Sequence, residues 1–236
     1  MQAHPCPTWV ITGTDTEVGK TVVTAALAAA LLTLGKRVSV FKPVQTGISA
    51  DDTPDDPTQI RQWLTPALSG KLSTACDLHL REPAAPWVAD SENVIHMDSL
   101  LAATRQAGED ADCLLVEGAG GVMVPFTKQD TFLDFMTALQ APVILVTRPD
   151  LGTINHTLLS LSALQSRGLT VAAIVVNRYP LSTDPATLPV AVATLPEVLR
   201  QYAPNIPLIL APDTPLSPGC VDADHPLVRA LAPLIC

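Results

Sequence analysis

Residues 9–21, WVITGTDTEVGKT, constrain the fold of this chain more than any other stretch. The apolar run Trp9–Ile11 reaches a turn that ends in Gly19, Lys20 and Thr21, and the Ala- and Leu-rich segment Val22–Leu34 follows with the composition of a helix. In such a unit the backbone N–H groups of the turn and of the helix N-terminus converge on a polyphosphate. The stretch therefore predicts a phosphate-binding loop.

The side chains and the glycine spacing of this loop refine the prediction. Lys20 is expected to reach the terminal phosphates and the Thr21 hydroxyl to ligate Mg²⁺. In the common pattern four residues separate the first glycine from the Gly-Lys pair. In this chain Thr14 occupies the position of that first glycine, and Gly13 lies one residue further back. The alternative is an ordinary turn between a strand and a buried helix. Because strand, turn and helix follow in the expected order, we interpret the stretch as a phosphate site.

Length and composition predict the architecture. Of the 236 residues, 47% are hydrophobic but only 4% aromatic, so the core must consist of Ala, Val, Leu and Ile. That composition suits a parallel sheet buried on both faces. The length fits one domain or at most two small ones, and no repeats or linker-like segments occur. We therefore expect residues 1–236 to form a single α/β domain of the P-loop NTPase type, with a mostly parallel sheet flanked by helices.

Charge and cysteine content limit the partners and the compartment. A net charge of −9 argues against nucleic acid or an anionic membrane as the main partner. The longest apolar segment, Val22–Leu34, is too short to span a bilayer, and residues 1–7 have neither the basic region nor the apolar core expected of a signal sequence. The five scattered cysteines have no C-x-x-C spacing and predict neither a disulfide framework nor a zinc site. We expect a protein of the reducing cytoplasm.

A second lysine is predicted beside the phosphate loop. Arg37–Lys42 alternates as a strand does, so residues 9–42 form a β-α-β unit. The right-handed crossover of such a unit places the carboxyl ends of both strands on one edge of the sheet. Lys42 should therefore lie near Lys20, and Pro43 is expected to end the strand.

Acidic candidates follow in two places. Asp51–Asp56 is a charge run whose ordinary interpretation is a solvated loop. Asp56 differs from its neighbours because it precedes Pro57, as a helix N-cap does, and a carboxylate there could also face Mg²⁺. The apolar strand Cys113–Val116 runs directly into Glu117. A carboxylate at such a strand end commonly holds the metal of a phosphate-loop protein, although a solvated side chain in a glycine-rich turn is the alternative.

The remaining segments are predicted more coarsely. We expect irregular structure with a short helix over residues 65–100. Asn177 follows a predicted strand and could form an Asx turn or contact a nucleotide base. A loop over 150–156 is expected to run into a helix that ends at about residue 167. The other expected elements are helices over 99–107, 188–202 with interruptions at Pro189 and Pro196, and 226–234, and strands over 142–147, 171–176 and 206–210.

Four stretches together resemble the dethiobiotin synthetases, the ATP-dependent enzymes of biotin biosynthesis. They are residues 12–21 (TGTDTEVGKT), 42–47 (KPVQTG), 116–121 (VEGAGG) and 151–156 (LGTINH). They occur in the family's order, and the loops of that family share the shifted first glycine. The resemblance is therefore more specific than a phosphate loop alone.

This resemblance implies an activity and a set of partners. The implied reaction converts 7,8-diaminopelargonic acid, CO₂ and MgATP to dethiobiotin, ADP and phosphate through a carbamate. Mg²⁺ is the implied cofactor. The implied enzyme is a homodimer that binds substrate between its subunits.

The resemblance also assigns roles to residues of this sequence. Asp55 could replace Asp56 as metal ligand, and Arg178 occupies a position that is often acidic, so the base contacts stay open. The implied catalytic residues are Lys20 and Lys42; the metal ligands Thr21, Asp56 and Glu117; the substrate contacts Thr46, Leu151, Gly152 and Asn155; and the nucleotide contacts Glu17, Val18, Gly19, Lys20, Thr21, Val22, Asp56, Glu117, Gly118, Ala119, Gly120, Asn177, Arg178 and Pro207.

Two other functions compete with this interpretation. Amide ligases of the same superfamily carry a glutamine-hydrolysing domain, for which the residues after 200 leave no room. Partition-type ATPase switches place a second lysine near the start of the loop, where this chain has Thr14 and Asp15, and they need a basic or amphipathic surface. Both comparisons favour the ligase.

Overall fold

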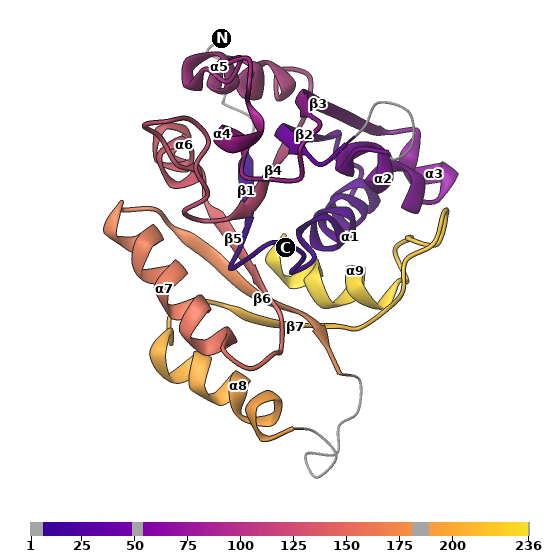
Figure 1. Cartoon of the computed structure of the whole chain (residues 1–236). Coiled ribbons are helices and arrows are strands. Elements are labelled where there is room, and N and C mark those ends of the chain that lie inside the picture. The colour runs from indigo at the N-terminus through magenta and orange to yellow at the C-terminus, as the bar shows by residue number, and fades with distance from the viewer. Residues whose placement is uncertain (1–6, 49–53, 181–188, 236) are drawn as a thin grey trace.

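The computed structural model describes residues 7–48, 54–180 and 189–235, and its centre is one parallel sheet (Figure 1). The seven strands lie in the order β3-β2-β4-β1-β5-β6-β7. Their bounds are β1 Thr8–Gly13, β2 Val38–Thr46, β3 Leu72–Leu80, β4 Cys113–Gly121, β5 Val143–Thr147, β6 Val171–Tyr179 and β7 Leu208–Pro212. The predicted fold class, an α/β sheet of parallel strands, is confirmed.

Helices cover both faces of this sheet, as Figure 1 shows. Helices α1, α2 and α9 pack on one face, and α5, α6, α7 and α8 pack on the other. The helices are α1 Lys20–Thr33, α2 Asp56–Trp63, α3 Pro66–Ser69, α4 Pro86–Ala89, α5 Met97–Ala107, α6 Phe132–Leu139, α7 Thr153–Ser166, α8 Val190–Tyr202 and α9 Pro226–Leu231, followed by the 3₁₀ turn Ala232–Leu234. Among the described residues, no helix is both long and apolar enough to cross a membrane.

The central strands are buried on both sides, which explains their continuous apolar sequences. Neighbouring residues of β1 enter different clusters, Val10 in the one under α5–α8 and Ile11 in the one under α1 and α9. Leu114 and Leu115 of β4 divide in the same way. Successive side chains of a strand point to opposite faces, so a strand covered twice needs an unbroken apolar run.

Strand β2 differs from its prediction at Pro43. The strand does not end there but continues to Thr46, paired with β3 along its length. Its pairing with β4 covers only Val38–Phe41. Proline is tolerated because β2 has already separated from β4 at that point. This separation opens the carboxyl edge of the sheet at Lys42.

The expectation of irregular structure over residues 65–100 was wrong in one respect. Strand β3 forms the edge of the sheet, and its residues alternate between more and less buried from Leu72 to Leu80. A similar alternation of apolar and polar residues is present in the sequence, but the three prolines around it favour the prediction of loops. Short helices α3 and α4 flank the strand.

Several predicted boundaries also moved. Helix α8 runs through Pro196 without interruption, and its predicted first residue, 188, lies outside the described residues. Strand β4 continues past Glu117 to Gly121, so this carboxylate lies within the strand rather than in a turn after it. The predicted types of the other elements agree with the structure.

Candidate active site

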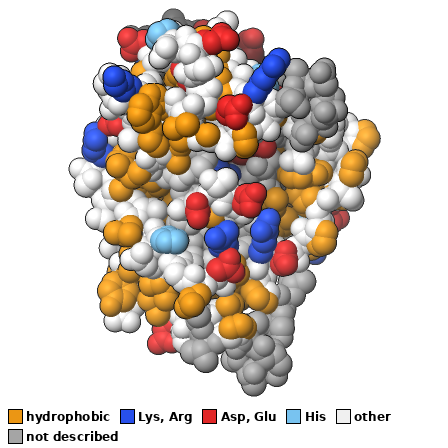
Figure 2. All heavy atoms as spheres, in the orientation of Figure 1, with side chains coloured by type: hydrophobic (Ala, Val, Ile, Leu, Met, Phe, Trp, Pro, Cys, Tyr) orange, Lys and Arg blue, Asp and Glu red, His pale blue; other side chains and the backbone are white. Residues whose placement is uncertain are grey.

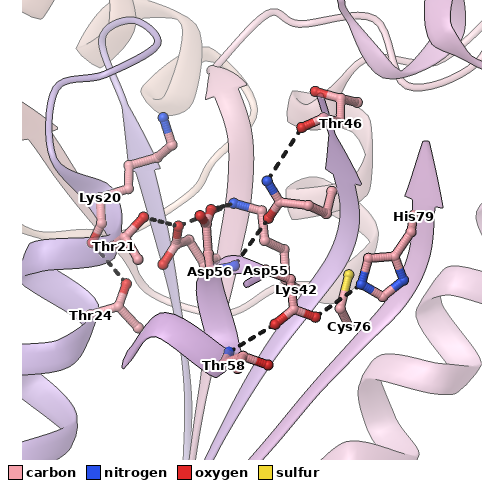
Figure 3. A network of polar contacts seen from close by, with 12 residues as sticks. Lys20, Thr21, Thr24, Lys42, Thr46, Asp55, Asp56, Thr58, Cys76 and His79 are labelled. Carbon is pink, nitrogen blue, oxygen red and sulfur yellow. Dashed lines mark hydrogen bonds and ion pairs between the residues drawn. The ribbon is translucent and has the colours of Figure 1, made fainter. Parts of the chain in front are cut away.

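A cavity of about 530 Å³ opens at the carboxyl edge of β1, β2 and β4, where the sequence placed the phosphate loop. Side chains from α1, β2, α2 and β4 meet there (Figure 3). The lining residues are Thr16, Glu17, Gly19, Lys20, Thr21, Val22, Lys42, Gln45, Thr46, Asp56, Gln59, Trp63, Glu117, Ala119, Gly120 and Arg178.

The loop between β1 and α1 is built for close backbone approach. A Cβ atom on Gly13 would lie 2.7 Å from Val18 Cγ2, so the chain can fold back over this position only if it is glycine. Gly19 precedes α1 with φ 93°, and no side chain caps the helix. The N–H groups at the start of α1 are thus left for an anion, which the helix dipole also favours.

Beside the loop lies a buried cluster of charges that the chain assembles from three elements. The Lys42 ammonium of β2 contacts the carboxylates of Asp56, from α2, and Glu117, from β4. The Lys42 Nζ to Glu117 Oε1 distance is 3.1 Å, and the Thr21 hydroxyl donates to the same oxygen at 2.8 Å. Both Lys42 and Glu117 are at most 3% exposed.

The two lysines of the cavity have opposite pKa shifts. Burial, and then the Lys42 ammonium, lower the pKa of Lys20 to about 8, against a smaller opposing effect of Glu117. Burial also lowers the pKa of Lys42, but the carboxylates of Glu117 and Asp56 more than offset it and the net pKa is raised. Burial raises the pKa of Glu117, while Lys42 opposes that shift. The carboxylates of the protein therefore stabilise the charged form of Lys42. They raise the pKa of Lys20 too little to offset its burial.

The donor set on the acidic side fits a hard divalent cation. Glu117 Oε2 is buried without a hydrogen-bond partner among the described residues, which is costly for a carboxylate oxygen. The Thr21 hydroxyl and the Asp56 carboxylate lie beside it in the same cavity. Carboxylate and hydroxyl oxygens are ligands that Mg²⁺ prefers.

The structure separates the roles of the two neighbouring aspartates. Asp55, not Asp56 as predicted, is the N-cap of α2, because its Oδ1 accepts the Thr58 N–H at 2.8 Å. Its other oxygen pairs with His79 Nε2 at 2.9 Å. Asp56 lies in the first turn, lines the cavity and contacts Lys42. Of the two, Asp56 is the one that lines the cavity.

Most, but not all, of the predicted nucleotide contacts line the cavity. Val18 is fully buried, and Asn177 is buried behind the loop, where its Nδ2 donates to the Val18 carbonyl at 3.0 Å. A Cβ atom on Gly118 would lie 2.2 Å from the Phe132 ring, so this glycine makes room for core packing. The structure brings together Glu17, Gly19, Lys20, Thr21, Val22, Asp56, Glu117, Ala119, Gly120 and Arg178.

Two groups of predicted residues lie elsewhere. Pro207 precedes β7 and therefore lies at the amino edge of the sheet, away from the cavity, while Pro212 ends the same strand. Pro207 therefore lies outside the candidate site. Leu151, Gly152 and Asn155 lie after β5 at the start of α7, on the correct edge but outside the lining of the cavity. The Leu151 side chain is 91% exposed.

The cavity also contains residues that the sequence argument missed. Gln59 and Trp63 follow Asp56 on α2 at spacings of three and seven residues. Side chains at those spacings share one face of a helix, so the helical period could have found them once Asp56 was chosen. Gln45, by contrast, is reached only because β2 continues past Pro43.

A chain of threonine hydroxyls connects the phosphate loop to α7. The Thr147 hydroxyl, at the end of β5, accepts from Thr14 and from Thr157, each at 3.1 Å. It lies 2.6 Å from the Thr153 hydroxyl. Thr147 accepts in its bonds with Thr14 and Thr157, so its single proton is left to be donated to Thr153. The residue that replaces the usual first glycine, Thr14, thus holds the loop to the start of α7.

Comparisons with known proteins agree with this geometry. Residues 7–203 match a family model described as an AAA domain. The ATP-dependent dethiobiotin synthetase BioD of Bacillus thuringiensis (strain Al Hakam) is 38% identical over 172 residues, which cover 71% of this chain and 69% of the relative. The enzyme of the same name from Bacillus subtilis (strain 168) is 38% identical over 176 residues, 74% of this chain and 75% of the relative.

Similar solved structures support the fold alone. The septum site-determining protein MinD of Pyrococcus horikoshii OT3, complexed with Mg-ADP, has a TM-score of 0.61 at 18% identity, covering 97% of this chain and 93% of that one. A ParA family ATPase from Chlorobium tepidum TLS has a TM-score of 0.59 at 13% identity, with 98% of each chain covered. The sequence relatives are the more specific, and they place this chain in the family of ATP-dependent dethiobiotin synthetases, ligases of biotin biosynthesis.

Proposed function

We propose that the chain converts 7,8-diaminopelargonic acid, CO₂ and ATP to dethiobiotin, ADP and phosphate through a carbamate. One amine of the substrate adds to CO₂ and loses a proton. The carbamate oxygen then attacks the γ-phosphate, forming a mixed carbamic-phosphoric anhydride and releasing ADP. The second amine attacks the carbamate carbon, loses a proton and closes the ureido ring, with phosphate leaving. Atoms and charges balance without any redox partner.

The observation that carries this proposal is the convergence of two buried ammonium groups on one cavity. Lys20 lies at the phosphate loop, and Lys42 lies across from it on β2. Phosphoryl transfer needs positioning and charge neutralisation more than covalent help. We assign Lys20 to the terminal phosphates and Lys42 to the γ-phosphate and the carbamate, which carry the charge that develops.

The remaining cavity residues support binding. Thr21, Asp56 and Glu117 are the proposed ligands of Mg²⁺, which when bound would neutralise phosphate charge. Thr46, at the end of β2, is the proposed contact for the diamine. The backbone of Gly19 and of the first turn of α1 is the proposed cradle for the phosphates.

We further propose a homodimer in which α7 of one subunit helps to bind the substrate of the other. A hollow of about 380 Å³ adjoins the phosphate loop, and part of its lining is apolar: Val122, Met123, Pro125, Leu159 and Ala163. Met123, Leu151 and Leu159 are each more than half exposed. Figure 2 shows hydrophobic side chains in several patches among charges of both signs on the face viewed there. Such side chains suit a subunit interface that also receives an aliphatic substrate.

Diamine-dependent consumption of ATP tests the proposed reaction. The purified protein should consume ATP only when Mg²⁺, bicarbonate and 7,8-diaminopelargonic acid are all present, with one phosphate released per dethiobiotin formed. Hydrolysis at the same rate without the diamine would contradict the ligase reaction and favour an ATPase switch.

Mixing a phosphate-loop variant with an Asn155→Ala variant tests the shared site of the proposed homodimer. Only mixed dimers would regain one complete site, so activity should return on mixing two inactive variants.

A further inference from the structure

We propose that Asp55, Cys76 and His79 form a second metal site, selective for a borderline transition ion such as Zn²⁺ and separate from the Mg²⁺ site. The three side chains come from the start of α2 and from the edge strand β3 (Figure 3). Their ligand atoms, a carboxylate oxygen, a sulfur and an imidazole nitrogen, all lie within 4.8 Å of one another.

The chemistry of the three ligands selects the class of metal. Thiolate and imidazole are ligands of Zn²⁺ and related transition ions, whereas Mg²⁺ takes oxygen. Around a tetrahedral Zn²⁺ the ligand atoms lie about 3.3 to 3.6 Å apart, so small side-chain rotations suffice. His79 is about half exposed and lies on an edge strand, where such movement is possible. Three protein ligands leave the fourth position for water.

The bonds already made by Asp55 leave one oxygen for the ion. Oδ1 accepts the Thr58 N–H and caps α2, while Oδ2 faces His79 Nε2 at 2.9 Å. An ion between Asp55 Oδ2 and His79 Nε2 would leave the bond that caps α2 intact. It would replace only the hydrogen bond between Asp55 and His79. The Asp55 side chain is 14% exposed, so its position is fixed by packing as well as by the cap.

The charges of the site also balance. The Cys76 thiol is partly buried and bonds to the Leu78 carbonyl at 3.5 Å. Binding of a divalent ion would displace the thiol proton to solvent, leaving a neutral set of one thiolate, one carboxylate, one imidazole and the ion. The ion would join the first turn of α2 to β3. It would therefore stabilise the element that carries Asp56 without entering the cavity.

Cobalt(II) substitution tests this site directly. One equivalent of Co²⁺, added to protein saturated with MgATP, should produce the thiolate-to-cobalt charge-transfer band that an all-oxygen site cannot give. Cys76→Ser should abolish the band, and His79→Gln should weaken Co²⁺ and Zn²⁺ binding at least tenfold. Cys220→Ser is the matched control, since Cys220 is a free, partly buried cysteine outside the cluster, and it should leave the band unchanged.

Thermal melting provides a second measurement. One equivalent of Zn²⁺ should raise the melting temperature of the wild-type protein and of Cys220→Ser, but not of Cys76→Ser. If the wild-type protein gives no charge-transfer band, or if Cys76→Ser and His79→Gln bind Zn²⁺ as tightly as the wild-type protein, the proposal is wrong. Neither variant touches the proposed catalytic residues, so diamine-dependent activity reports separately on the proposed function.

Discussion

The carboxyl edge of the sheet differs on the two sides of β1. Toward β4 and β2 lie the buried charges of Lys42 and Glu117, and one oxygen of Glu117 has no partner among the described residues. Toward β5 and β6 the buried polar groups are neutral: Thr147, Thr153 and Asn177 are buried and hydrogen-bonded. Both sides are equally deep in the fold, so burial alone does not account for the difference.

The comparison separates binding groups from support. Buried charges that lack full compensation cost free energy, and they persist where a ligand completes them. Buried hydroxyls and amides that satisfy one another stabilise a single arrangement of the backbone. We therefore interpret the charged side as the site of chemistry and the neutral side as the support that holds the phosphate loop. Four predictions test this division.

The largest effect is expected for Lys42→Met on the charged side. The substitution keeps most of the side-chain volume but removes the ammonium group that we assign to the γ-phosphate and carbamate. Turnover should fall by at least about 10²- to 10³-fold, as for the loss of a transition-state donor. Steady-state kinetics measures this, with circular dichroism to check folding. Lys71→Met changes an exposed lysine and should behave as wild type. Wild-type turnover of Lys42→Met would remove Lys42 from the mechanism.

Glu117→Gln should act mainly on the metal. The amide keeps the shape of the carboxylate but loses its charge, so the Mg²⁺ concentration needed for half-maximal activity should rise about 10- to 100-fold. A Mg²⁺ titration of activity measures this. Glu109→Gln, an exposed residue after α5, is the control. An unchanged Mg²⁺ requirement would show that Glu117 is not a ligand.

Thr147→Val should break the neutral side without removing any charge. It deprives three neighbouring hydroxyls of their shared partner, and the free energy of unfolding should fall by about 1–3 kcal/mol. Denaturant titration measures the loss. Thr104→Val is the matched control, because Thr104 is also fully buried but makes one hydrogen bond, to the Leu100 carbonyl. Equal losses in both variants would mean that the hydroxyl chain has no special role.

The smallest effect is a pH dependence of nucleotide binding. Because the pKa of Lys20 is lowered to about 8, its ammonium is lost as the pH rises above that value in the free protein. ATP affinity should therefore fall above pH 8, and binding should take up a proton there. Calorimetry in buffers of different ionisation enthalpy measures the proton. In Lys20→Met the uptake should disappear; if it persists, another group titrates.

The same pKa shift affects folding with a defined sign. Lys20 has a folded pKa below its unfolded value of 10.5, so between pH 8 and 10.5 the unfolded chain binds more protons than the folded one. The contribution of Lys20 to the free energy of unfolding therefore rises with pH across this window. Its burial as a cation is a cost that bound phosphate would remove.

Local sequence determined the parts of the fold that depend on nearest neighbours. The apolar runs of β1, β4 and β5, the phosphate loop and the start of α1 were predictable because side-chain period and turn chemistry act over a few residues. The position of Lys42 beside the loop was also predictable, since the right-handed crossover is nearly invariant. The resemblance to a known family then indicated which reaction and which residue roles to expect at this site.

Tertiary structure alone decided how distant segments meet. Whether Asp55 or Asp56 faces the cavity depended on where α2 begins. The distance of Pro207 from the cavity depended on the direction in which β7 runs in the sheet. The partners of Asp55 and Thr14 come from β3 and β5, far along the chain. Sequence patterns specify the period and the ends of each element, but contacts across the sheet follow from the packing of the whole chain.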